Sequence, residues 1–398
     1  MNSTPSAKRA LLMVSLAFFA LGMAVASIGP VMSELSARTN ASLSAMGAIF
    51  TALFLGALTM QLLSGLILHR VGYLPMLVGG ALLGTLGMIG IFLSPSYPLL
   101  LASALILGLG HGSLNLSGNL SIAALFPEKR VASVNFVNVF YALGAFIGPA
   151  LAGFSVMKVN TGMPVFWLGS LLILCSGLFM WGTPLSVSPQ HETSPAPSIP
   201  KARLLASPIL WSLVILSLFY GGSETGMSGW TTTYLQQSVG FPLERAAFVT
   251  SAFYLALTFG RILCSWLGSK LTDLQILIGT LTVAFAGTLL FVAGFGNPMV
   301  STIAVLIIGL GYGGTYPTMI ALTTVVFKES SGKAASIIIS LGSIGGSALP
   351  ALQGVILEQA GPLPSTYMVA GMALGMLLAI LTGSQFLPAR ASTAKMIE

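Results

Sequence analysis

Charged side chains are scarce in this sequence, at 6% of its 398 residues. A soluble domain carries roughly 25% charged residues, so this chain has too few to cover a surface that faces water. Cysteine is scarcer still, and the two cysteines, Cys175 and Cys264, fall within apolar stretches. We expect both thiols to be buried packing residues, and their placement predicts neither a disulfide framework nor a metal site.

Long apolar runs take the place of the missing charge, and 55% of the residues are hydrophobic. The runs are continuous and about 20 or more residues long, the length that crosses a hydrocarbon core about 30 Å thick. A transmembrane β-barrel would need short alternating segments instead. We therefore predict an all-α membrane protein with twelve transmembrane helices, at about 10–32, 43–68, 73–93, 97–125, 131–157, 163–183, 208–235, 244–269, 274–294, 297–327, 334–357 and 365–387.

The first run also has the features of a signal peptide, because Lys8 and Arg9 precede it and "AVA" stands before Ser27 like a cleavage site. The run is long, however, and eleven more follow it. We therefore interpret it as the first transmembrane span.

Lysine and arginine set the expected orientation, because cytoplasmic loops of membrane proteins carry an excess of them. With the N-terminus in the cytoplasm, twelve of these residues fall on the inner side and three on the outer side. The inner set is Lys8, Arg9, Arg70, Lys129, Arg130, Lys201, Arg203, Lys270, Lys328, Lys333, Arg390 and Lys395, and the outer set is Arg38, Lys158 and Arg245. Both termini of a multi-pass plasma (inner) membrane protein are therefore expected in the cytoplasm. The same asymmetry accounts for the net charge of +7 without a nucleic-acid partner.

A proline- and serine-rich stretch divides the spans into six and six. We expect residues 185–207 to be a flexible cytoplasmic linker between bundles at 1–184 and 208–398. The bundles resemble each other, since "LILGLGHGSLN" at 105–115 matches "LIIGLGYGGTY" at 306–316 with an offset of 201 residues. Repeats of this kind are typical of secondary transporters, which bind their substrate near the midplane between the repeats. The sequence thus predicts two six-helix repeats around a central cavity.

The loop between the second and third spans carries a further pattern, "SGLILHRVGYLPMLVGG". It resembles the signature of the major facilitator superfamily, a glycine followed by an acidic residue, an arginine and a second glycine. Gly65, Arg70 and Gly72 fit this signature, while His69 stands where the aspartate is usual. The resemblance implies the twelve-helix fold of that superfamily and makes Arg70 a candidate gating residue.

Several spans resemble the fucose/proton symporter family and its sodium-dependent glucose transporter-like relatives. The similar stretches are "YGGSETGMSGW", "GHGSLNLSGN", "GYGGTYPTMIAL" and "GSIGGSALPALQG". Glu224 and Trp230 fall on the glycine–acid–tryptophan pattern of these relatives. Asn115, followed by a matching Asn119, occupies a position that is often acidic. The resemblance implies ion-coupled sugar transport, and it implies that the first, fourth, seventh and tenth spans line the cavity.

Glu224 is the one carboxylate expected in the middle of a span, since all other acidic residues lie in loops, in tails or at span ends. A charge at the bilayer centre costs on the order of 2.5–3.5 kcal/mol, so such residues usually face a cavity and have a function. Glu224 would carry a coupling proton, or stay ionised and hold a cation or solute hydroxyls, or make a structural hydrogen bond to a neighbouring helix. The glycines at 221, 222, 226 and 229 predict a locally irregular backbone around it.

The fourth span carries His111, Asn115 and Asn119 at i, i+4 and i+8, so they share one face of a helix. The repeat places Tyr312 and Tyr316 at the equivalent positions of the tenth span. Asparagine amides both donate and accept hydrogen bonds, which suits the hydroxyls of a sugar. The alternative is hydrogen bonding between helices together with close packing at glycines.

Further candidates lie in other spans. Asn138 belongs to a weaker polar face in the fifth span, and Tyr220 stands one helical turn before Glu224. Trp230 would stack on a sugar ring or act as a membrane-interface anchor. Arg261, the only basic residue well inside a span, would gate the inner half, contact solute or extend toward the cytoplasmic interface. Helix rise puts Arg261 about 13 Å and Glu224 about 25 Å from the cytoplasmic ends of their spans, so we expect no direct ion pair.

These features favour a proton- or cation-coupled symporter that imports a small polar solute, with a monosaccharide as the first candidate. The expected partners are that solute, a coupling ion (proton or sodium) and the lipid bilayer, for a monomer without a cofactor. The alternative is a proton-coupled exporter of drugs or metabolites, because Gly144, Gly148, Pro149 and Gly153 resemble a glycine–proline motif of antiporters. A uniporter also stays open. An enzyme is not expected, since no catalytic triad, metal cluster or phosphate loop is recognisable.

Overall fold

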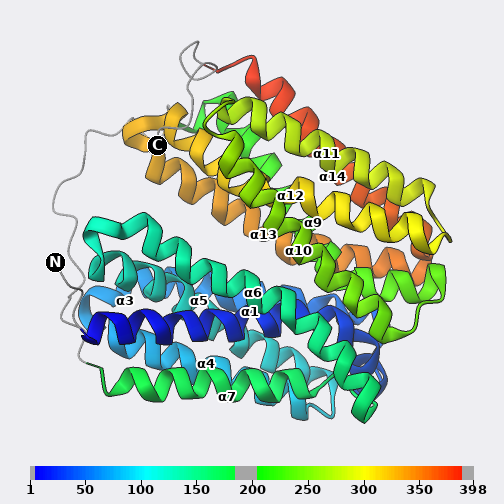
Figure 1. Cartoon of the computed structure of the whole chain (residues 1–398), viewed down its shortest axis with the longest axis horizontal. Coiled ribbons are helices and arrows are strands. Elements are labelled where there is room, and N and C mark those ends of the chain that lie inside the picture. The colour runs from blue at the N-terminus through cyan, green and yellow to red at the C-terminus, as the bar shows by residue number, and fades with distance from the viewer. Residues whose placement is uncertain (1–4, 184–203, 388–398) are drawn as a thin grey trace. The chain divides into compact units, whose positions relative to one another are not determined.

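The computed structural model describes residues 5–183 and 204–387, and over these residues the chain consists of helices and has no strand (Figure 1). The long helices are α1 (Pro5–Thr39), α3 (Ala48–Val71), α4 (Tyr73–Leu93), α5 (Tyr97–Leu125), α6 (Arg130–Val159), α7 (Pro164–Trp181), α9 (Pro208–Val239), α10 (Leu243–Leu267), α11 (Asp273–Ala293), α12 (Pro298–Phe327), α13 (Ser331–Gln359) and α14 (Pro362–Ser384). A short helix, α2 (Leu43–Met46), precedes α3, and the 3-10 turns η1 (Pro127–Lys129) and η2 (Lys328–Ser330) follow α5 and α12. The twelve predicted spans are confirmed as helices, and α1 continues about two turns beyond its expected end.

Eleven of the described long helices are apolar and long enough to cross a membrane. The exception is α9, which carries the polar stretch between Tyr220 and Thr233. Although α9 is less apolar than the other long helices, it is continuous over all 32 of its residues. A helix that is long but less apolar than its neighbours is expected to be shielded from lipid by them, and α9 is buried along most of this stretch.

The chain divides into two compact units. The first contains α1–α7 together with Leu243–Ser251 at the start of α10. The second contains α9, the rest of α10 from Ala252, and α11–α14. Most of the predicted linker, 185–203, lies outside the described residues.

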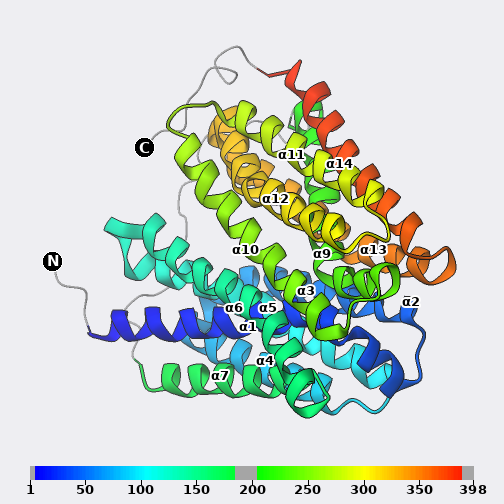
Figure 2. The ribbon, with the colours of Figure 1, turned by 45° about the vertical axis from the view of Figure 1, so that its right-hand side comes forward.

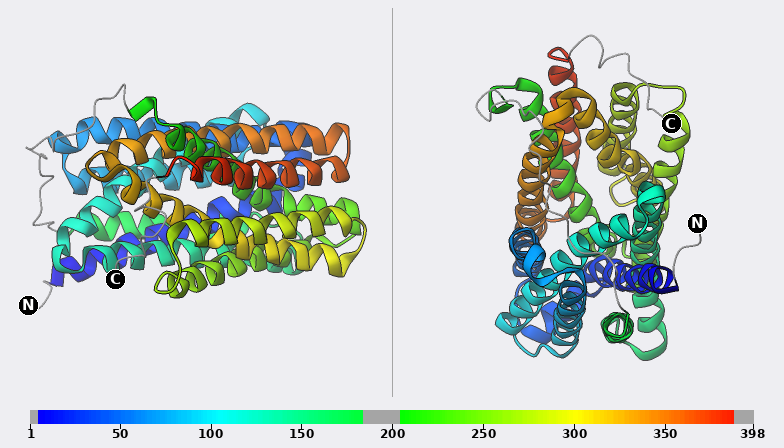
Figure 3. Two further views of the ribbon diagram at one scale, coloured as in Figure 1. Left: turned by 90° about the horizontal axis from the view of Figure 1, so that it is seen from above. Right: turned by 90° about the vertical axis from the view of Figure 1, so that its left-hand side faces the viewer.

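Helix pairing within the two units follows the same plan. In the first unit α1 packs mainly on α6 and also on α7, while α5 packs on α3 and α4. In the second unit α9 packs mainly on α13 and also on α14, and α12 packs on α11 (Figures 2 and 3). The pairs α4–α7 and α11–α14 also correspond. The internal repeat predicted from sequence therefore extends to the order in which helices contact one another.

Glycines set the closest helix contacts in both units. A Cβ at Gly22 of α1 would overlap the backbone of Tyr141 on α6, and a Cβ at Gly221 of α9 would overlap the backbone of Gly342 on α13. Tyr141 and Gly342 are 201 residues apart, and Gly22 and Gly221 are 199 residues apart, so the two contacts correspond with a shift of two residues between α1 and α9. Small residues let transmembrane helices approach this closely and gain van der Waals packing.

The predicted irregular backbone around Glu224 is wrong, because α9 is a continuous helix from Pro208 to Val239. Its glycines serve side-to-side packing instead. Gly221 faces the backbone of α13, and Gly222 and Gly226 face Leu349 and Gln353 on the same helix. An intact helix satisfies all its backbone hydrogen bonds internally, which inside a membrane outweighs the weak helix propensity of glycine.

Candidate transport site

The second unit contains a cluster of aromatic and charged side chains around Glu224. Tyr220 and Glu224 lie one turn apart on α9, and Tyr312 and Tyr316 lie one turn apart on α12. The ring of Tyr220 stacks on that of Tyr316 with centroids 6.0 Å apart, and it meets Tyr312 edge-on at 5.8 Å. Glu224 and Tyr316 remain partly accessible, whereas Tyr220 is buried. We call Tyr220, Glu224, Tyr316 and Arg261 the acidic cluster.

Arg261 of α10 completes the acidic cluster. Its guanidinium interacts electrostatically with the Glu224 carboxylate, and the Tyr220 hydroxyl lies close to both groups. That hydroxyl makes no well-formed hydrogen bond, and the buried Nε of Arg261 has no partner within the described residues. The depth estimate placed Glu224 and Arg261 far apart, whereas their electrostatic interaction shows that packing brings the two groups closer than that estimate implied. The cluster therefore holds a carboxylate and a cation, together with two buried polar atoms, the Tyr220 hydroxyl and Arg261 Nε, that have no hydrogen-bond partner within the described residues.

Two residues that were predicted to contact the solute, Tyr312 and Trp230, use their polar atoms for hydrogen bonds to other helices. Tyr312 is fully buried, and its hydroxyl hydrogen-bonds to that of Ser223 on α9. The Trp230 side chain is 1% exposed, and its indole Nε1 donates to the Pro350 carbonyl at 2.8 Å. The six-membered edge of the indole faces Gly354, where a Cβ would collide with it. Both rings act as packing elements of the second unit in this conformation.

The polar face of α5 in the first unit is partly used to join helices. Asn138 of α6 donates from Nδ2 to Asn119 Oδ1 at 3.0 Å and to the Val134 carbonyl at 2.9 Å. Asn119 in turn donates to the Asn115 carbonyl at 2.8 Å. Asn119 and Asn138 thus form the interhelical hydrogen bond that was the alternative to solute binding. The side-chain amide of Asn115 takes part in no such bond within the described residues and is partly accessible.

His111 lies one turn before Asn115, near the middle of α5. Its ring stacks on that of Tyr141 from α6, with centroids 6.0 Å apart and planes at 24°. The Nδ1 atom is buried without a hydrogen-bond partner, although the residue as a whole is partly accessible.

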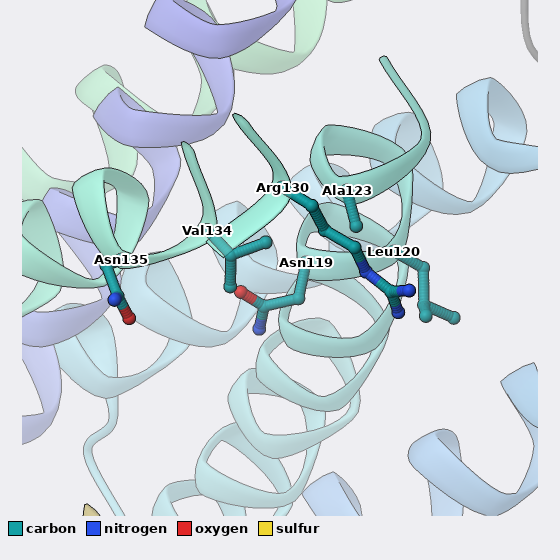
Figure 4. A pocket seen from close by; sticks show the side chains of 6 residues that line it. All are labelled: Asn119, Leu120, Ala123, Arg130, Val134 and Asn135. Atoms are coloured by element: carbon teal, nitrogen blue, oxygen red, sulfur yellow. The ribbon is translucent and has the colours of Figure 1, made fainter. Parts of the chain in front are cut away.

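A pocket of about 280 Å³ opens where the end of α5 meets the start of α6 (Figure 4). Its lining consists of Asn119, Leu120, Ala123, Arg130, Val134 and Asn135. Sequence reasoning treated Arg130 only as a topology marker. At the offset of 201 residues, the equivalents of the pocket's two asparagines, Asn119 and Asn135, are Ile320 and Ser336, so the second repeat has no asparagine at either position.

The loop signature between α3 and α4 has a local structural explanation. Gly72 ends α3 with φ +86°, a conformation that favours glycine, and its N–H donates to the Leu68 carbonyl at 2.8 Å. Arg70 lies exposed in the last turn of α3. Its gating role stays a prediction.

Two charged residues near the C-terminal end of α1 have structural partners in the first unit. Arg38 donates to the Phe92 and Ile91 carbonyls at 2.7 Å each, where α4 ends and leaves carbonyls unsatisfied. Glu34 accepts from Thr161 Oγ1 at 2.5 Å and from the Gly162 N–H at 2.9 Å. Cys264 is buried as predicted, whereas Cys175 is exposed, so the prediction that both thiols are buried is wrong for Cys175. Across residues 5–183 and 204–387 there is no group of three His, Cys, Asp or Glu side chains that could hold a metal ion.

Helices of membrane-spanning length, in two bundles that pair their helices in the same way, are typical of an integral multi-pass membrane protein. The profile of the Major Facilitator Superfamily matches residues 14–350, and the chain belongs to that superfamily.

Curated relatives and solved structures agree with this assignment. The human sodium-dependent glucose transporter 1 is 23% identical over 93% of this chain and 78% of that protein. Protein TsgA of Escherichia coli O17:K52:H18 is 24% identical over 87% of both chains. The resemblance to the superfamily and to glucose transporter-like relatives, stated from sequence, is thus confirmed.

The same fold occurs in solved transporters. The D-xylose-proton symporter superposes with a TM-score of 0.80 at 17% identity, covering 97% of this chain and 99% of that one. The nucleoside transporter NupG gives a TM-score of 0.76 at 13% identity, covering 96% and 100%. At these identities the likeness shows the fold alone.

Proposed function

We propose that this protein is a secondary active transporter that moves a small polar solute of the sugar class by alternating access, coupled to a proton or another cation. The observation that carries the proposal is the acidic cluster, in which a partly accessible carboxylate inside a membrane helix lies beside a cation and two tyrosines. Ionisable residues inside membrane helices usually belong to ion or substrate pathways. Proteins that this chain resembles include a glucose transporter, a D-xylose symporter and a nucleoside transporter, and this supports a hydroxyl-rich solute.

The acidic cluster suits a coupling role because its electrostatic balance depends on one carboxyl group. With Glu224 ionised, its charge is compensated by Arg261, so the empty cluster is close to neutral. A proton or a sodium ion on Glu224 would remove that compensation and free the Arg261 guanidinium. Ion binding could then shift the equilibrium between the inward-facing and outward-facing conformations, provided that the ion binds one of them more tightly. A ligand can shift a conformational equilibrium only by its differential affinity for the two states.

The solute contacts we propose are Tyr220, Tyr316 and Glu224 in the second unit and Asn115 in the first. Tyrosine rings offer flat apolar surfaces together with hydroxyls, and the Asn115 amide can donate and accept. Asn119 and Asn138 support the binding face through their mutual hydrogen bond. Tyr312 and Trp230 leave the proposed set, because their polar atoms are bonded within the second unit.

The antiporter-like glycines do not favour export on their own, because packing accounts for them. A Cβ at Gly144 or Gly148 of α6 would overlap the α1 backbone at Phe19 or Met23. We propose import into the cytoplasm across the plasma (inner) membrane, by a monomer with both termini inside and no cofactor.

Uptake by purified protein in liposomes tests the coupling role of Glu224. Radiolabelled D-glucose, D-xylose and uridine are offered with an inward proton gradient or an inward sodium gradient. We expect one gradient to drive accumulation by the wild type. Glu224→Gln should abolish accumulation but keep exchange of labelled for unlabelled solute. The glutamine amide has nearly the same shape as the carboxyl group but cannot bind and release a proton.

The matched control is Glu128→Gln, which neutralises an exposed carboxylate in η1. It should accumulate solute like the wild type. Normal accumulation by Glu224→Gln would refute the coupling role. Absence of any response of the wild type to these sugars and the nucleoside would refute the solute class.

A further inference from the structure

The two repeats treat equivalent aromatic residues of α5 and α12 differently. His111 and Tyr312 are related by the offset of 201 residues and stand between the same pair of glycines, Gly110–Gly112 and Gly311–Gly313. The Tyr312 hydroxyl is satisfied by Ser223 of α9. The buried Nδ1 of His111 has no partner within the described residues.

The sequence of α1 has no hydroxyl at the position that corresponds to Ser223 of α9. The packing glycine of α9, Gly221, is followed two residues later by Ser223, which carries the hydroxyl. The equivalent glycine of α1, Gly22, is followed two residues later by Ala24, which carries none. The first repeat therefore lacks the group that makes Tyr312 a structural residue in the second.

The burial of Nδ1 predicts which nitrogen of His111 holds the proton. In a neutral imidazole one nitrogen donates and the other accepts. Buried N–H groups without an acceptor are rarer in proteins than buried acceptors without a donor. The tautomer that leaves no buried N–H without an acceptor has a lone pair on Nδ1. Its proton is on Nε2, at the accessible edge of the ring. An imidazolium would place an N–H on the buried Nδ1 as well.

We propose that His111 is a solute-recognition residue that donates one hydrogen bond from Nε2–H to an oxygen of the transported molecule and carries no coupling proton. The inference rests on the proposed function and deepens it. It predicts that the solute presents a neutral oxygen, such as a hydroxyl or ring oxygen, to His111. Stacking on Tyr141 holds the imidazole plane, and the accessible amide of Asn115 one turn away offers a second contact. Both groups lie on one face of α5.

Amide substitutions distinguish the two ring nitrogens. The amide nitrogen of glutamine can reach the position of histidine Nε2, whereas that of asparagine reaches only to Nδ1. We expect His111→Gln to keep most of the affinity for the solute, and His111→Asn and His111→Leu to lower it about tenfold or more. The matched control is Tyr312→Phe, which removes the hydroxyl bonded to Ser223. It should lower the thermal midpoint and leave solute affinity unchanged.

Affinity is measured by thermal shift with D-glucose, D-xylose and uridine and with single-deoxy derivatives of whichever responds. The wild type should lose affinity for one deoxy position, and His111→Leu should no longer discriminate at that position. Equal affinity of the wild type, His111→Asn and His111→Leu would overturn the recognition role while leaving the transport proposal intact.

A second measurement needs no solute. The chain has three histidines, His69, His111 and His191, so protein labelled with ¹⁵N-histidine gives few imidazole signals, and His111→Gln identifies one of them. We expect that signal to report a neutral ring with its proton on Nε2 near pH 7. A proton on Nδ1, or an imidazolium at that pH, would overturn the inference even if none of the sugars binds.

Discussion

At the scale of the residue, hydrogen-bond partners separate structural polar groups from available ones. Trp230 and Tyr312 have partners on a neighbouring helix of their own unit. Tyr220 and His111 each have a buried polar atom that finds no hydrogen-bond partner in the part of the chain that the structure describes. An unsatisfied buried polar group costs about 1–3 kcal/mol, so it persists where a ligand or a functional requirement maintains it. This distinction selects the residues that we propose for recognition.

Replacement of Trp230 by phenylalanine tests its structural role. The change removes the bond to the Pro350 carbonyl and leaves a void beside Gly354. We expect the free energy of unfolding to fall by about 1–3 kcal/mol, with solute affinity of the folded protein unchanged. Thermal unfolding and solute titration of the same sample measure both quantities. Lost affinity at unchanged stability would make Trp230 a solute contact after all.

Glu224 and Arg261 are expected to be coupled energetically. Arg261→Gln alone leaves the carboxylate without its compensating cation, whereas the double variant with Glu224→Gln leaves no uncompensated charge. We expect a coupling energy of about 1–2 kcal/mol in a double-mutant cycle of unfolding free energies. Additive effects within about 0.3 kcal/mol would show that the two groups do not interact.

At the scale of the element, a glycine-rich stretch can mark either an irregular backbone or a close contact between regular helices. The sequence pattern does not distinguish the two. Glycine-rich stretches of α6 and α9 suggested an antiporter motif and an irregular backbone. In the structure they are contact points between regular helices. Which glycines are contact points depends on the facing helix, which lies more than a hundred residues away along the chain.

A matched pair of glycine-to-alanine variants tests this interpretation. A Cβ at Gly144 would overlap the α1 backbone, whereas a Cβ at Gly79 of α4 meets nothing within 4 Å. Gly144→Ala should lower the free energy of unfolding by about 1–3 kcal/mol through overpacking. Gly79→Ala should be neutral or stabilising by up to about 1 kcal/mol, because alanine is the better helix former. Similar thermal midpoints for the two variants would contradict the packing role.

At the scale of the whole molecule, the orientation across the membrane still depends on the distribution of lysine and arginine. Single cysteines placed in a background free of Cys175 and Cys264 can test it. Ser96, between α4 and α5, is expected outside, and Lys129, between α5 and α6, is expected inside; both are exposed. A membrane-impermeant thiol reagent applied to intact cells should label Ser96→Cys and spare Lys129→Cys. The reverse pattern would invert the proposed topology.

The fold was largely predictable because its signals are local. Continuous apolar runs of spanning length predict helices whatever surrounds them, since backbone groups in lipid must be satisfied within the segment. The repeat at an offset of 201 residues then predicted the correspondence between α5 and α12, which their contacts bear out. The candidate site was predictable only as a set of polar residues within spans.

The sequence by itself determined the class of protein, the number of long helices and the position of Glu224 within one of them. Tertiary structure alone decided that Arg261 lies near Glu224, that Asn119 and Asn138 are joined by a hydrogen bond, and that the polar atoms of Trp230 and Tyr312 are bonded within the second unit. The physical reason is that span length and hydropathy are properties of continuous stretches of the chain. A side chain's hydrogen-bond partner depends instead on which other helix packs against it.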